Sequence, residues 1–321
     1  MSGQVITVNG PIEAGELGFT LSHEHLMLDF FSYQGSYDDV LDEEKVMIWE
    51  LEHYIRAGGK SLVDCTNIGL KRDHLALRRI AEATGTNIIM GSGWYRERVY
   101  PSYIYELSTN ELADRVVREI EFGVDGSDVR AGMIGEIGTE INSISPAQER
   151  VFRAAARAQQ RTGVSIWTHT THFGSLALEQ IALLKEEGVR TDRIVISHLG
   201  DRFDSEFLRP IAETGVFMSI DNIGYEGNGY PDDEVRANNI AFLIREGFIR
   251  QVMMSMDIGA KKFLLSYRGH GFAHLIKSFL PRLKSKGITE EEISVMTVEN
   301  PQRALSVAQN TRVDEVAASM A

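Results

Sequence analysis

The sequence alternates regularly between short apolar runs and amphipathic helical patterns. Eight runs have the composition of β-strands: Leu17–Asp29, Lys60–Asn67, Asn87–Trp94, Ala131–Thr139, Val164–Thr170, Arg193–Leu199, Val216–Ile223 and Arg250–Asp257. Several, such as Ile194-Val195-Ile196, are continuously apolar, which is typical of strands buried on both faces. Strands that alternate with helices form parallel sheets. Eight such units in 321 residues predict an α/β fold of the TIM (β/α)8 barrel type.

The helical patterns between the runs have recognisable ends. Helices are predicted at Glu43–Ala57, Asp73–Thr84, Asn110–Phe122, Ser145–Gly163, Ser175–Glu187, Ser205–Thr214, Asp232–Gly247 and Phe272–Lys286. The clearest start is Ser145-Pro146-Ala147-Gln148, which has the serine and glutamine of a capping box and proline at the first helical position. An open, doubly wound sheet is the alternative arrangement. It would carry a glycine-rich phosphate turn after the first strand, where this chain has His23-Glu24-His25.

The domain organisation is expected to be simple. Residues 1–321 are predicted to form one barrel domain, because no low-complexity linker interrupts the alternation. The N-terminal segment 1–16 is predicted to form a small hairpin across the bottom of the barrel. The tail 311–321 is rich in alanine and serine and is expected to pack loosely.

Composition excludes several classes of protein. No run of about 18 apolar residues is present, so no membrane span is expected, and no secretory signal is visible at the N-terminus. Cys65 is the single cysteine, which rules out an internal disulfide and fits a cytoplasmic protein. The net charge of −13 argues against nucleic-acid binding, which requires basic residues to neutralise phosphates.

Metal-ligating residue types stand at the ends of the predicted strands. His23 and His25 are two residues apart, so on a strand both imidazoles point to the same face. TIM barrels carry their chemistry at the C-terminal ends of the strands. The side chains expected there are His23, His25, Glu136, His169, His198 and Asp257. A lone histidine is more often structural, but four histidines and two carboxylates at one barrel mouth favour a metal site.

The mixture of ligands indicates which metals such a site would take. Imidazole with carboxylate favours Zn²⁺, Mn²⁺, Co²⁺ or Fe²⁺ over Ca²⁺ or Mg²⁺. Six ligands are too many for one tetrahedral zinc. They suit two divalent ions bridged by one carboxylate and a hydroxide. We therefore expect two metal ions, with zinc as the first choice.

This pattern resembles the amidohydrolase superfamily and, within it, the phosphotriesterase-like family. Further matching segments are Ala131-Gly132-Met133-Ile134, Gly269-His270-Gly271-Phe272 and Glu299-Asn300-Pro301. The resemblance implies that His23, His25 and Asp257 hold the more buried metal and that His169 and His198 hold the more exposed one. It also implies a homodimer.

The end of the fourth strand departs from the pattern of many family members, which bridge the metals with a carboxylated lysine. Residues 133–139 contain no lysine and present Glu136 instead. The chain therefore resembles the branch with a bridging glutamate, which includes phosphotriesterase homology proteins, phosphotriesterase-related proteins and lactonases. This departure argues against transferring phosphotriesterase activity directly.

The expected chemistry is hydrolysis of a small molecule by the metal-bridging hydroxide, with Asp257 accepting its proton. The resemblance makes Tyr95 a candidate contact to the substrate, since lactone-hydrolysing members have a tyrosine over the metals there. Tyr225 lies in a glycine-rich loop that could cap the site. Lys261, Lys262 and Arg268 are basic residues near the predicted mouth that could bind an anionic group on the substrate, and Lys261 and Arg268 are the candidates we choose. The alternative for each is a side chain that packs its loop or is solvated.

These residues leave three functional hypotheses open. The first is hydrolysis of a lactone. The second keeps the same metal centre but cleaves the amide of an N-acyl amino or sulfonic acid, or a phosphotriester. The third is a barrel without activity that binds a ligand or partner, although the presence of all six ligand residues argues against it.

Overall fold

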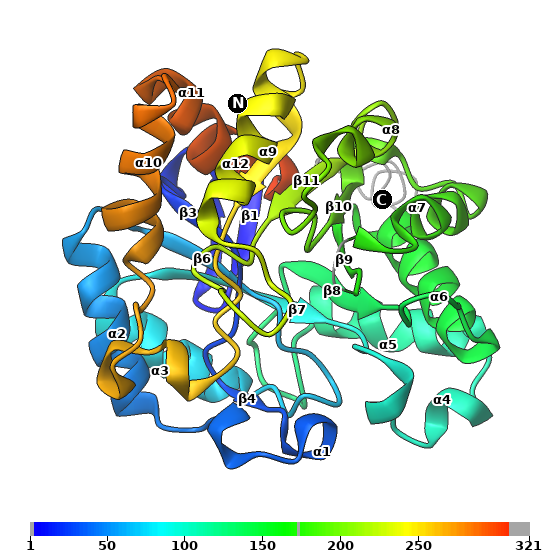
Figure 1. Ribbon diagram of the computed structural model, residues 1–321. Coiled ribbons are helices and arrows are strands. Elements are labelled where there is room, and N and C mark those ends of the chain that lie inside the picture. Colours follow the sequence, from blue (N-terminus) through cyan, green and yellow to red (C-terminus); the bar gives the residue numbers. More distant parts are fainter. Residues whose placement is uncertain (1–2, 172–173, 308–321) are drawn as a thin grey trace.

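The computed structural model describes residues 3–171 and 174–307, and its centre is an eight-stranded parallel sheet (Figure 1). The barrel strands are β3 (Thr20–Glu24), β6 (Ser61–Asp64), β7 (Asn87–Ser92), β8 (Met133–Gly138), β9 (Ile166–His169), β10 (Ile194–Ile196), β11 (Phe217–Ile220) and β12 (Val252–Met254). Each lies within one of the predicted runs. The backbone N–H of Asp257 donates to the carbonyl of His23 at 3.1 Å, which joins the end beyond β12 to β3. The sheet thus curves into a nearly closed barrel, and the TIM-barrel prediction is confirmed.

Helices surround the sheet, as the alternation predicted (Figure 1). Those between or after the barrel strands are α2 (Glu44–Arg56), α3 (His74–Thr84), α5 (Thr109–Glu121), α6 (Pro146–Thr162), α7 (Ala177–Glu186), α8 (Arg209–Ala212), α9 (Asp233–Arg245) and α10 (Leu280–Ser285). Two short helices, α1 (Phe31–Gln34) and α4 (Tyr103–Glu106), lie in the loops after β3 and β7.

Two of the predicted helices are less regular than expected, and one helical region was missed. The predicted helix 205–214 is a 3-10 turn, Ser205–Leu208, followed by α8. The predicted helix 272–286 begins as a π-turn, Leu275–Phe279, just before Pro281 in α10. The missed region contains α11 (Glu290–Ser294), a second π-turn and α12 (Asn300–Leu305). Pro301 lies in this region. Like Pro281, it has no backbone N–H and so interrupts the hydrogen-bond pattern of a regular α-helix, which the sequence periodicity assumes.

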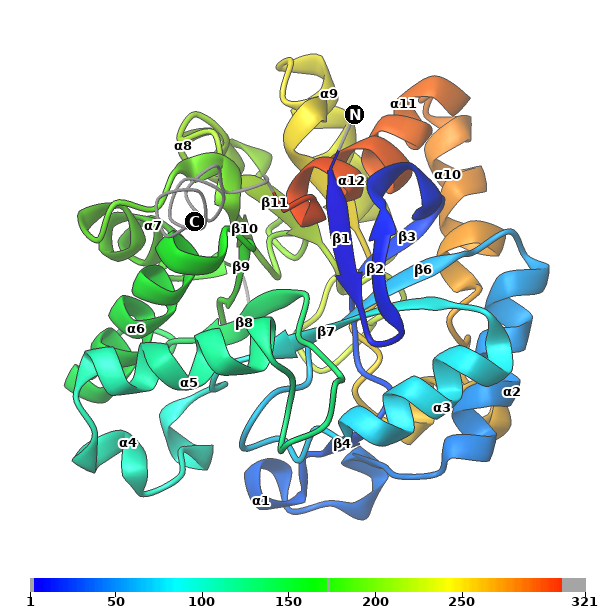
Figure 2. The same cartoon turned by 180° about the vertical axis from the view of Figure 1, so that it is seen from behind.

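The N-terminal hairpin lies where it was expected. Strands β1 (Gln4–Thr7) and β2 (Gly10–Glu13) pair antiparallel, and Figure 2 shows them beside α12 on the side of the barrel away from the loops of β4 and α1. The N–H of Val8 donates to the carbonyl of Ile88 at 3.0 Å, near the start of β7. The hairpin therefore covers the N-terminal end of the barrel. The predicted tail 311–321 lies outside the described residues. A second hairpin, β4 (Leu28–Asp29) with β5 (Val40–Leu41), frames the loop after β3.

Apolar side chains fill the inside of the barrel. Seven strands contribute one member each to a buried cluster: Val63, Ile89, Met133, Trp167, Val195, Phe217 and Met253. Leu17 and Leu305 join it from the chain ends, and Cys65 is buried in the same cluster, as expected. A larger cluster lies between strands and helices. Because the barrel interior is packed, the polar side chains at the strand ends rest on a rigid floor.

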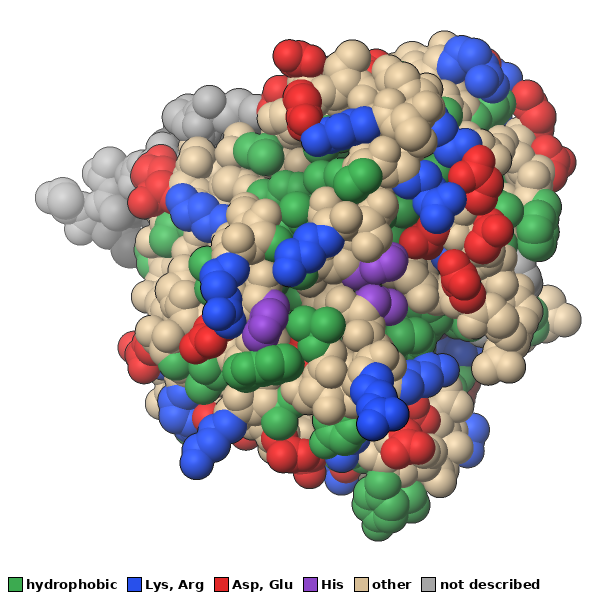
Figure 3. Space-filling view, turned by 60° about the vertical axis from the view of Figure 1, so that its left-hand side comes forward, with side chains coloured by type: hydrophobic (Ala, Val, Ile, Leu, Met, Phe, Trp, Pro, Cys, Tyr) green, Lys and Arg blue, Asp and Glu red, His purple; other side chains and the backbone are tan. Residues whose placement is uncertain are grey.

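The surface does not concentrate charge of one sign on the face shown in Figure 3, where acidic and basic side chains are interspersed. Among the helices of the described residues, none has both the length and the apolar character needed to span a membrane.

The cap of α6 generates a prediction. Ser145 Oγ accepts the N–H of Gln148 at 3.2 Å, and Gln148 Oε1 accepts the N–H of Ser145 at 3.0 Å. Ser145→Ala is expected to lower the free energy of unfolding by about 1 kcal/mol, because the helix start loses an acceptor and Glu97 loses the hydroxyl that donates to it. Urea denaturation checks this. Ser285→Ala is the control, since the hydroxyl of Ser285 is exposed and, among the described residues, bonds only to the Arg282 carbonyl. Equal stabilities of the two variants would contradict the prediction.

Candidate metal centre

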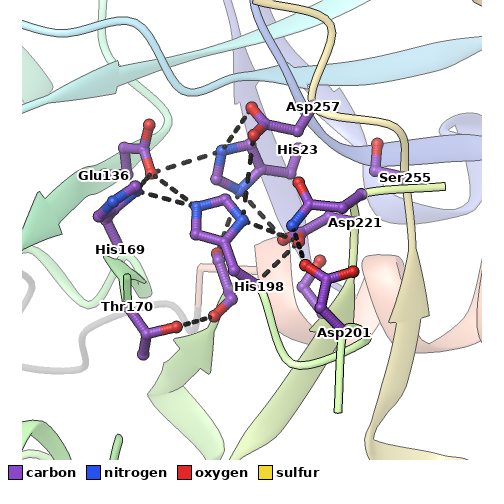
Figure 4. Close-up of polar contacts among 12 residues, drawn as sticks. His23, Glu136, His169, Thr170, His198, Asp201, Asp221, Ser255 and Asp257 are labelled. Carbon is purple, nitrogen blue, oxygen red and sulfur yellow. Dashed lines mark hydrogen bonds and ion pairs between the residues drawn. The ribbon is translucent and has the colours of Figure 1, made fainter. Parts of the chain in front are cut away.

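Glu136 lies close to all four predicted histidine ligands, and Figure 4 shows its contacts with His23, His169 and His198. Its Oε2 is 3.0 Å from Nδ1 of His169 and 3.5 Å from Nε2 of both His23 and His198. Its Oε1 is 3.4 Å from Nε2 of His25. The structure thus brings these five side chains, which come from four different strands or strand ends, to one point.

Asp257 closes the same cluster from the other side. Its Oδ1 lies 3.2 Å from Nε2 of His25 and 3.5 Å from Nε2 of His23. Its side chain is 20% exposed, whereas that of Glu136 is only 2% exposed. Asp257 is therefore the more solvent-accessible of the two carboxylates.

Local backbone geometry directs these ligand residues. His198 lies two residues after β10 and Asp257 three residues after β12, and both have left-handed backbone angles, with φ of 63° and 53°. Such angles turn the chain away from the strand, so both side chains point over the barrel mouth. Gly135 precedes Glu136 and also has a positive φ, 130°. A Cβ atom there would lie 2.2 Å from the carbonyl oxygen of Trp167, so only glycine fits at this position.

The far sides of the imidazole rings are held by hydrogen bonds. Asp221 Oδ1 lies 2.9 Å from Nδ1 of His198 and accepts the backbone N–H of His198 at the same distance. Nδ1 of His23 hydrogen-bonds to Ser197 Oγ at 3.1 Å and lies 3.3 Å from Asp221 Oδ2, and Thr66 Oγ1 is 2.9 Å from Nδ1 of His25. These contacts turn the Nε2 atoms toward Glu136 and Asp257, which is how metal-ligating histidines are commonly oriented.

Sequence reasoning missed Asp221, although a signal was present. Asp221 directly follows β11 and ends its apolar run, just as Glu136 and His169 stand at the ends of theirs. No comparable pattern in the sequence indicates that Thr66 contacts a histidine ring.

The charges of the cluster favour a cation. Burial lowers the pKa of His198, but Asp221, Glu136 and Asp257 outweigh it and raise the pKa to about 10. Burial is likewise outweighed at His25, where Asp257 and Glu136 raise the pKa to about 9. The pKa of His169 falls to about 4, chiefly through burial, which keeps this ring neutral. A metal ion could replace the protons that the carboxylates would otherwise attract to the histidines.

The residues fit a metal on structural grounds. Nε2 of His23 is buried and makes no hydrogen bond to any described residue, although it faces both carboxylates. Three groups bring their ligand atoms within 4.8 Å of one another: His23, His25 and Glu136; Glu136, His169 and His198; and His23, His198 and Asp221. The first two groups share Glu136, which matches a carboxylate placed between two ions. A cation would satisfy the unpaired nitrogen, and imidazole with carboxylate suits zinc-like metals.

Comparison with known proteins agrees with this geometry. The model of the phosphotriesterase family matches residues 3–305. The chain belongs to the phosphotriesterase family. It is 34% identical over 286 residues to the phosphotriesterase homology protein of Escherichia coli, covering 89% of this chain and 97% of that one. It is 32% identical to the N-acetyltaurine hydrolase of Danio rerio, covering 95% and 99%. The crystal structure of a lactonase from Listeria monocytogenes superposes with a TM-score of 0.89 at 30% identity, covering 95% and 100%.

A cavity of about 610 Å³ opens above the cluster. Tyr95 and Tyr225 line it, whereas Lys261 and Arg268 do not. The segment around Lys261 is a 3-10 turn, Lys261–Phe263, in which neighbouring side chains point in different directions. Nζ of Lys261 lies 4.0 Å from Asp42, while Lys262 lines the cavity. The sequence thus predicted a basic residue in this loop but not which lysine would line the cavity.

Asp221 generates a prediction about metal binding. Asp221→Asn replaces one carboxylate oxygen with an N–H₂ group. Because that oxygen faces a ring nitrogen of His23 or His198, one of these rings loses its fixed orientation. The affinity for Zn²⁺ is expected to weaken about 10- to 100-fold while the fold is kept. Competition with a chromogenic chelator measures the affinity, and circular dichroism checks the fold. A folded variant with unchanged affinity would show that Asp221 does not orient the rings.

His270, which lies beyond the cluster, generates a prediction about pH. Burial lowers its pKa from 6.5 to about 4, aided by the nearby His274. The unfolded chain therefore binds this proton more readily than the folded protein between these values, and stability falls as the pH is lowered through that window. His270→Phe keeps a ring against Phe263 and is expected to reduce the loss of stability from pH 7 to pH 5 by about 1–2 kcal/mol. Urea denaturation of the wild type and the variant at pH 7 and pH 5 measures this loss. Identical losses of stability in the two proteins would show that His270 does not cause the pH dependence.

Proposed function

We propose that this chain is a metal-dependent hydrolase that cleaves the ester bond of a lactone. The placement of Tyr95 in the cavity carries this proposal. Its hydroxyl lies 3.1 Å from Nε2 of His169, whose Nδ1 faces Glu136 at 3.0 Å. When Nδ1 serves as a metal ligand, Nε2 carries the proton and donates to the Tyr95 oxygen. The Tyr95 hydrogen is then free to donate to a substrate oxygen.

Tyr95 is suited to remain a donor throughout the reaction. Burial, reinforced by the charge of Glu136, raises the pKa of Tyr95 well above its usual range. The hydroxyl therefore keeps its hydrogen at neutral pH. A buried donor aimed at the place where an ester oxygen gains negative charge stabilises that charge more strongly than water does.

In the proposed site, His23, His25 and Asp257 would hold one metal ion and His169 and His198 a second, and Glu136 would be a ligand of both. A bound divalent cation supplies Lewis-acid chemistry here: it activates water and polarises a carbonyl oxygen. Asp257 accepts the proton released when water attacks. Because its side chain is 20% exposed at the cavity floor, it can pass that proton on to solvent.

The walls of the cavity suit a small molecule with an acyl chain. Phe30, Ile141 and Phe263 line it with apolar surface, and Tyr33 and Asn228 add polar groups. Its volume lies within the range of small-molecule sites. The similarity to the lactonase from Listeria monocytogenes supports an ester substrate.

The amide of an N-acyl amino acid or sulfonic acid is the second candidate substrate. Arg96 and Lys262 both line the cavity and could bind the anionic group of such a substrate. The similarity to N-acetyltaurine hydrolases supports this alternative. Arg96 is already ion-paired with Glu140, so Lys262 is the better candidate for the anionic contact.

The experiment that tests the function is a panel assay on protein supplied with Zn²⁺ or Mn²⁺. The panel contains γ- and δ-lactones, N-acetyltaurine, N-acyl amino acids and an aryl phosphotriester, with Glu136→Ala as the inactive control. Lactone turnover that is absent in the control is the expected result. Turnover of the amides alone would favour the second candidate. Absence of any turnover in metal-loaded protein would leave a ligand-binding barrel.

Tyr95→Phe is predicted to lower kcat for the lactone about 10- to 100-fold, because it removes one hydrogen-bond donor to the developing charge. The KM is expected to change less than threefold, since the ring still lines the cavity. Tyr100→Phe is the matched control: Tyr100 follows in the same loop, does not line the cavity, and its hydroxyl bonds to no described residue. Steady-state kinetics on both variants measures the effect. Equal kcat values for the two would remove Tyr95 from the mechanism.

A further inference from the structure

The loop after β12 holds Asp257 in an uncommon backbone conformation. Asp257 has φ of 53°, in the left-handed region that residues other than glycine adopt only infrequently. Such a residue keeps its geometry only when its neighbours fix it. Contacts to the peptide groups on both sides of Asp257 would provide that support.

Glu24 provides it from β3. This residue lies between His23 and His25, and its side chain is completely buried. Its Oε1 accepts the hydroxyl of Ser255 at 2.7 Å and the N–H of Met256 at 2.9 Å. Its Oε2 accepts the N–H of Ile258 at 2.9 Å. One carboxylate thus binds the residues immediately before and after Asp257.

The remaining backbone groups of Asp257 are also bound. Its N–H donates to the carbonyl of His23 at 3.1 Å, and its carbonyl accepts the hydroxyl of Tyr225 at 2.6 Å. Tyr225 therefore lines the cavity with its hydroxyl already engaged by the Asp257 backbone. Together with Glu24, these contacts tie the loop of Asp257 to the strand that carries both histidines.

Glu24 itself lies outside the cluster that it supports. Side chains alternate along a strand, so Glu24 points away from the face shared by His23 and His25. It does not line the cavity, and none of the three candidate metal groups of the described residues includes it. Its three bonds all go to the segment Ser255–Ile258.

We propose that Glu24 is a positioning residue for Asp257: it fixes the distance between that carboxylate and the imidazoles of His23 and His25. This inference deepens the proposed function and rests on its metal site. Both side-chain oxygens of Glu24 are needed as acceptors, because together they accept from three donors. Glutamine would place an N–H₂ group against one of those donors and leave that pair unsatisfied.

Glu50 in α2 is a matched control. It is also completely buried, and it accepts the N–H groups of Leu265 and Ser266 at 3.1 and 2.8 Å and the Ser266 hydroxyl at 2.8 Å. It therefore binds two backbone amides and one serine, as Glu24 does, farther along the same connection. None of its partners adjoins Asp257. E50Q should disturb the loop to a similar extent without moving Asp257.

The experiment compares wild type, E24Q and E50Q in two measurements. Metal-free protein is titrated with Zn²⁺ against a chromogenic chelator, and amide hydrogen exchange is followed by mass spectrometry. We expect the Zn²⁺ affinity of E24Q to weaken at least tenfold and that of E50Q to stay within twofold. Exchange should accelerate at residues 255–258 in E24Q only. On an active substrate, kcat of E24Q should fall at least tenfold with KM within threefold.

Equal weakening of Zn²⁺ affinity in E24Q and E50Q would overturn the proposal, because it would show that Glu24 only stabilises the loop in general and does not position Asp257. Unchanged affinity and exchange in E24Q would overturn it as well. If E24Q does not fold, E24D keeps the charge but is too short to reach both amides, and it must show the same effects. If the wild type binds no Zn²⁺, the proposed function fails, while hydrogen exchange still decides whether Glu24 fixes the loop.

Discussion

One carboxylate, that of Glu136, lies within 3.5 Å of a nitrogen on each of four histidine rings in the barrel mouth. Little water reaches this place, since the Glu136 side chain is only 2% exposed. Bringing so many polar groups together out of water is costly unless each finds a partner. The arrangement leaves a buried nitrogen of His23 unpaired among the described residues. A cation is the simplest group that satisfies the whole set.

The barrel makes this arrangement possible in two ways. Its packed interior, which includes Trp167, is rigid and supports the polar side chains that lie above it at the barrel mouth. Around the rings, Asp221 and Thr66 hold the nitrogens that face away from the centre. The rings of His198 and His25 therefore have their directions set by a neighbour, as is common for metal-ligating histidines.

Much of this was predictable from the sequence, because strand-end chemistry follows from local patterns. The spacing of His23 and His25 and the positions of Glu136, His169, His198 and Asp257 at the ends of apolar runs were sufficient to predict that these residues meet. That prediction required only the side-chain alternation of strands and the parallel order of a barrel.

Contacts that depend on turn geometry were not predictable in this way. Which of Lys261 and Lys262 lines the cavity depends on a single 3-10 turn. That Glu24 reaches across to residues 256 and 258 depends on how the loop after β12 bends back over β3. Such loop paths arise from tertiary packing, which has no periodic signal in the sequence.

The metal content of the purified protein tests this account most directly. Protein prepared without chelators is measured by elemental analysis, before and after dialysis against Zn²⁺ or Mn²⁺, beside Glu136→Ala. The geometry predicts about two divalent ions per chain in the wild type and a clear loss in the variant. A wild-type protein that holds no metal, and takes up none when metal is supplied, would contradict it.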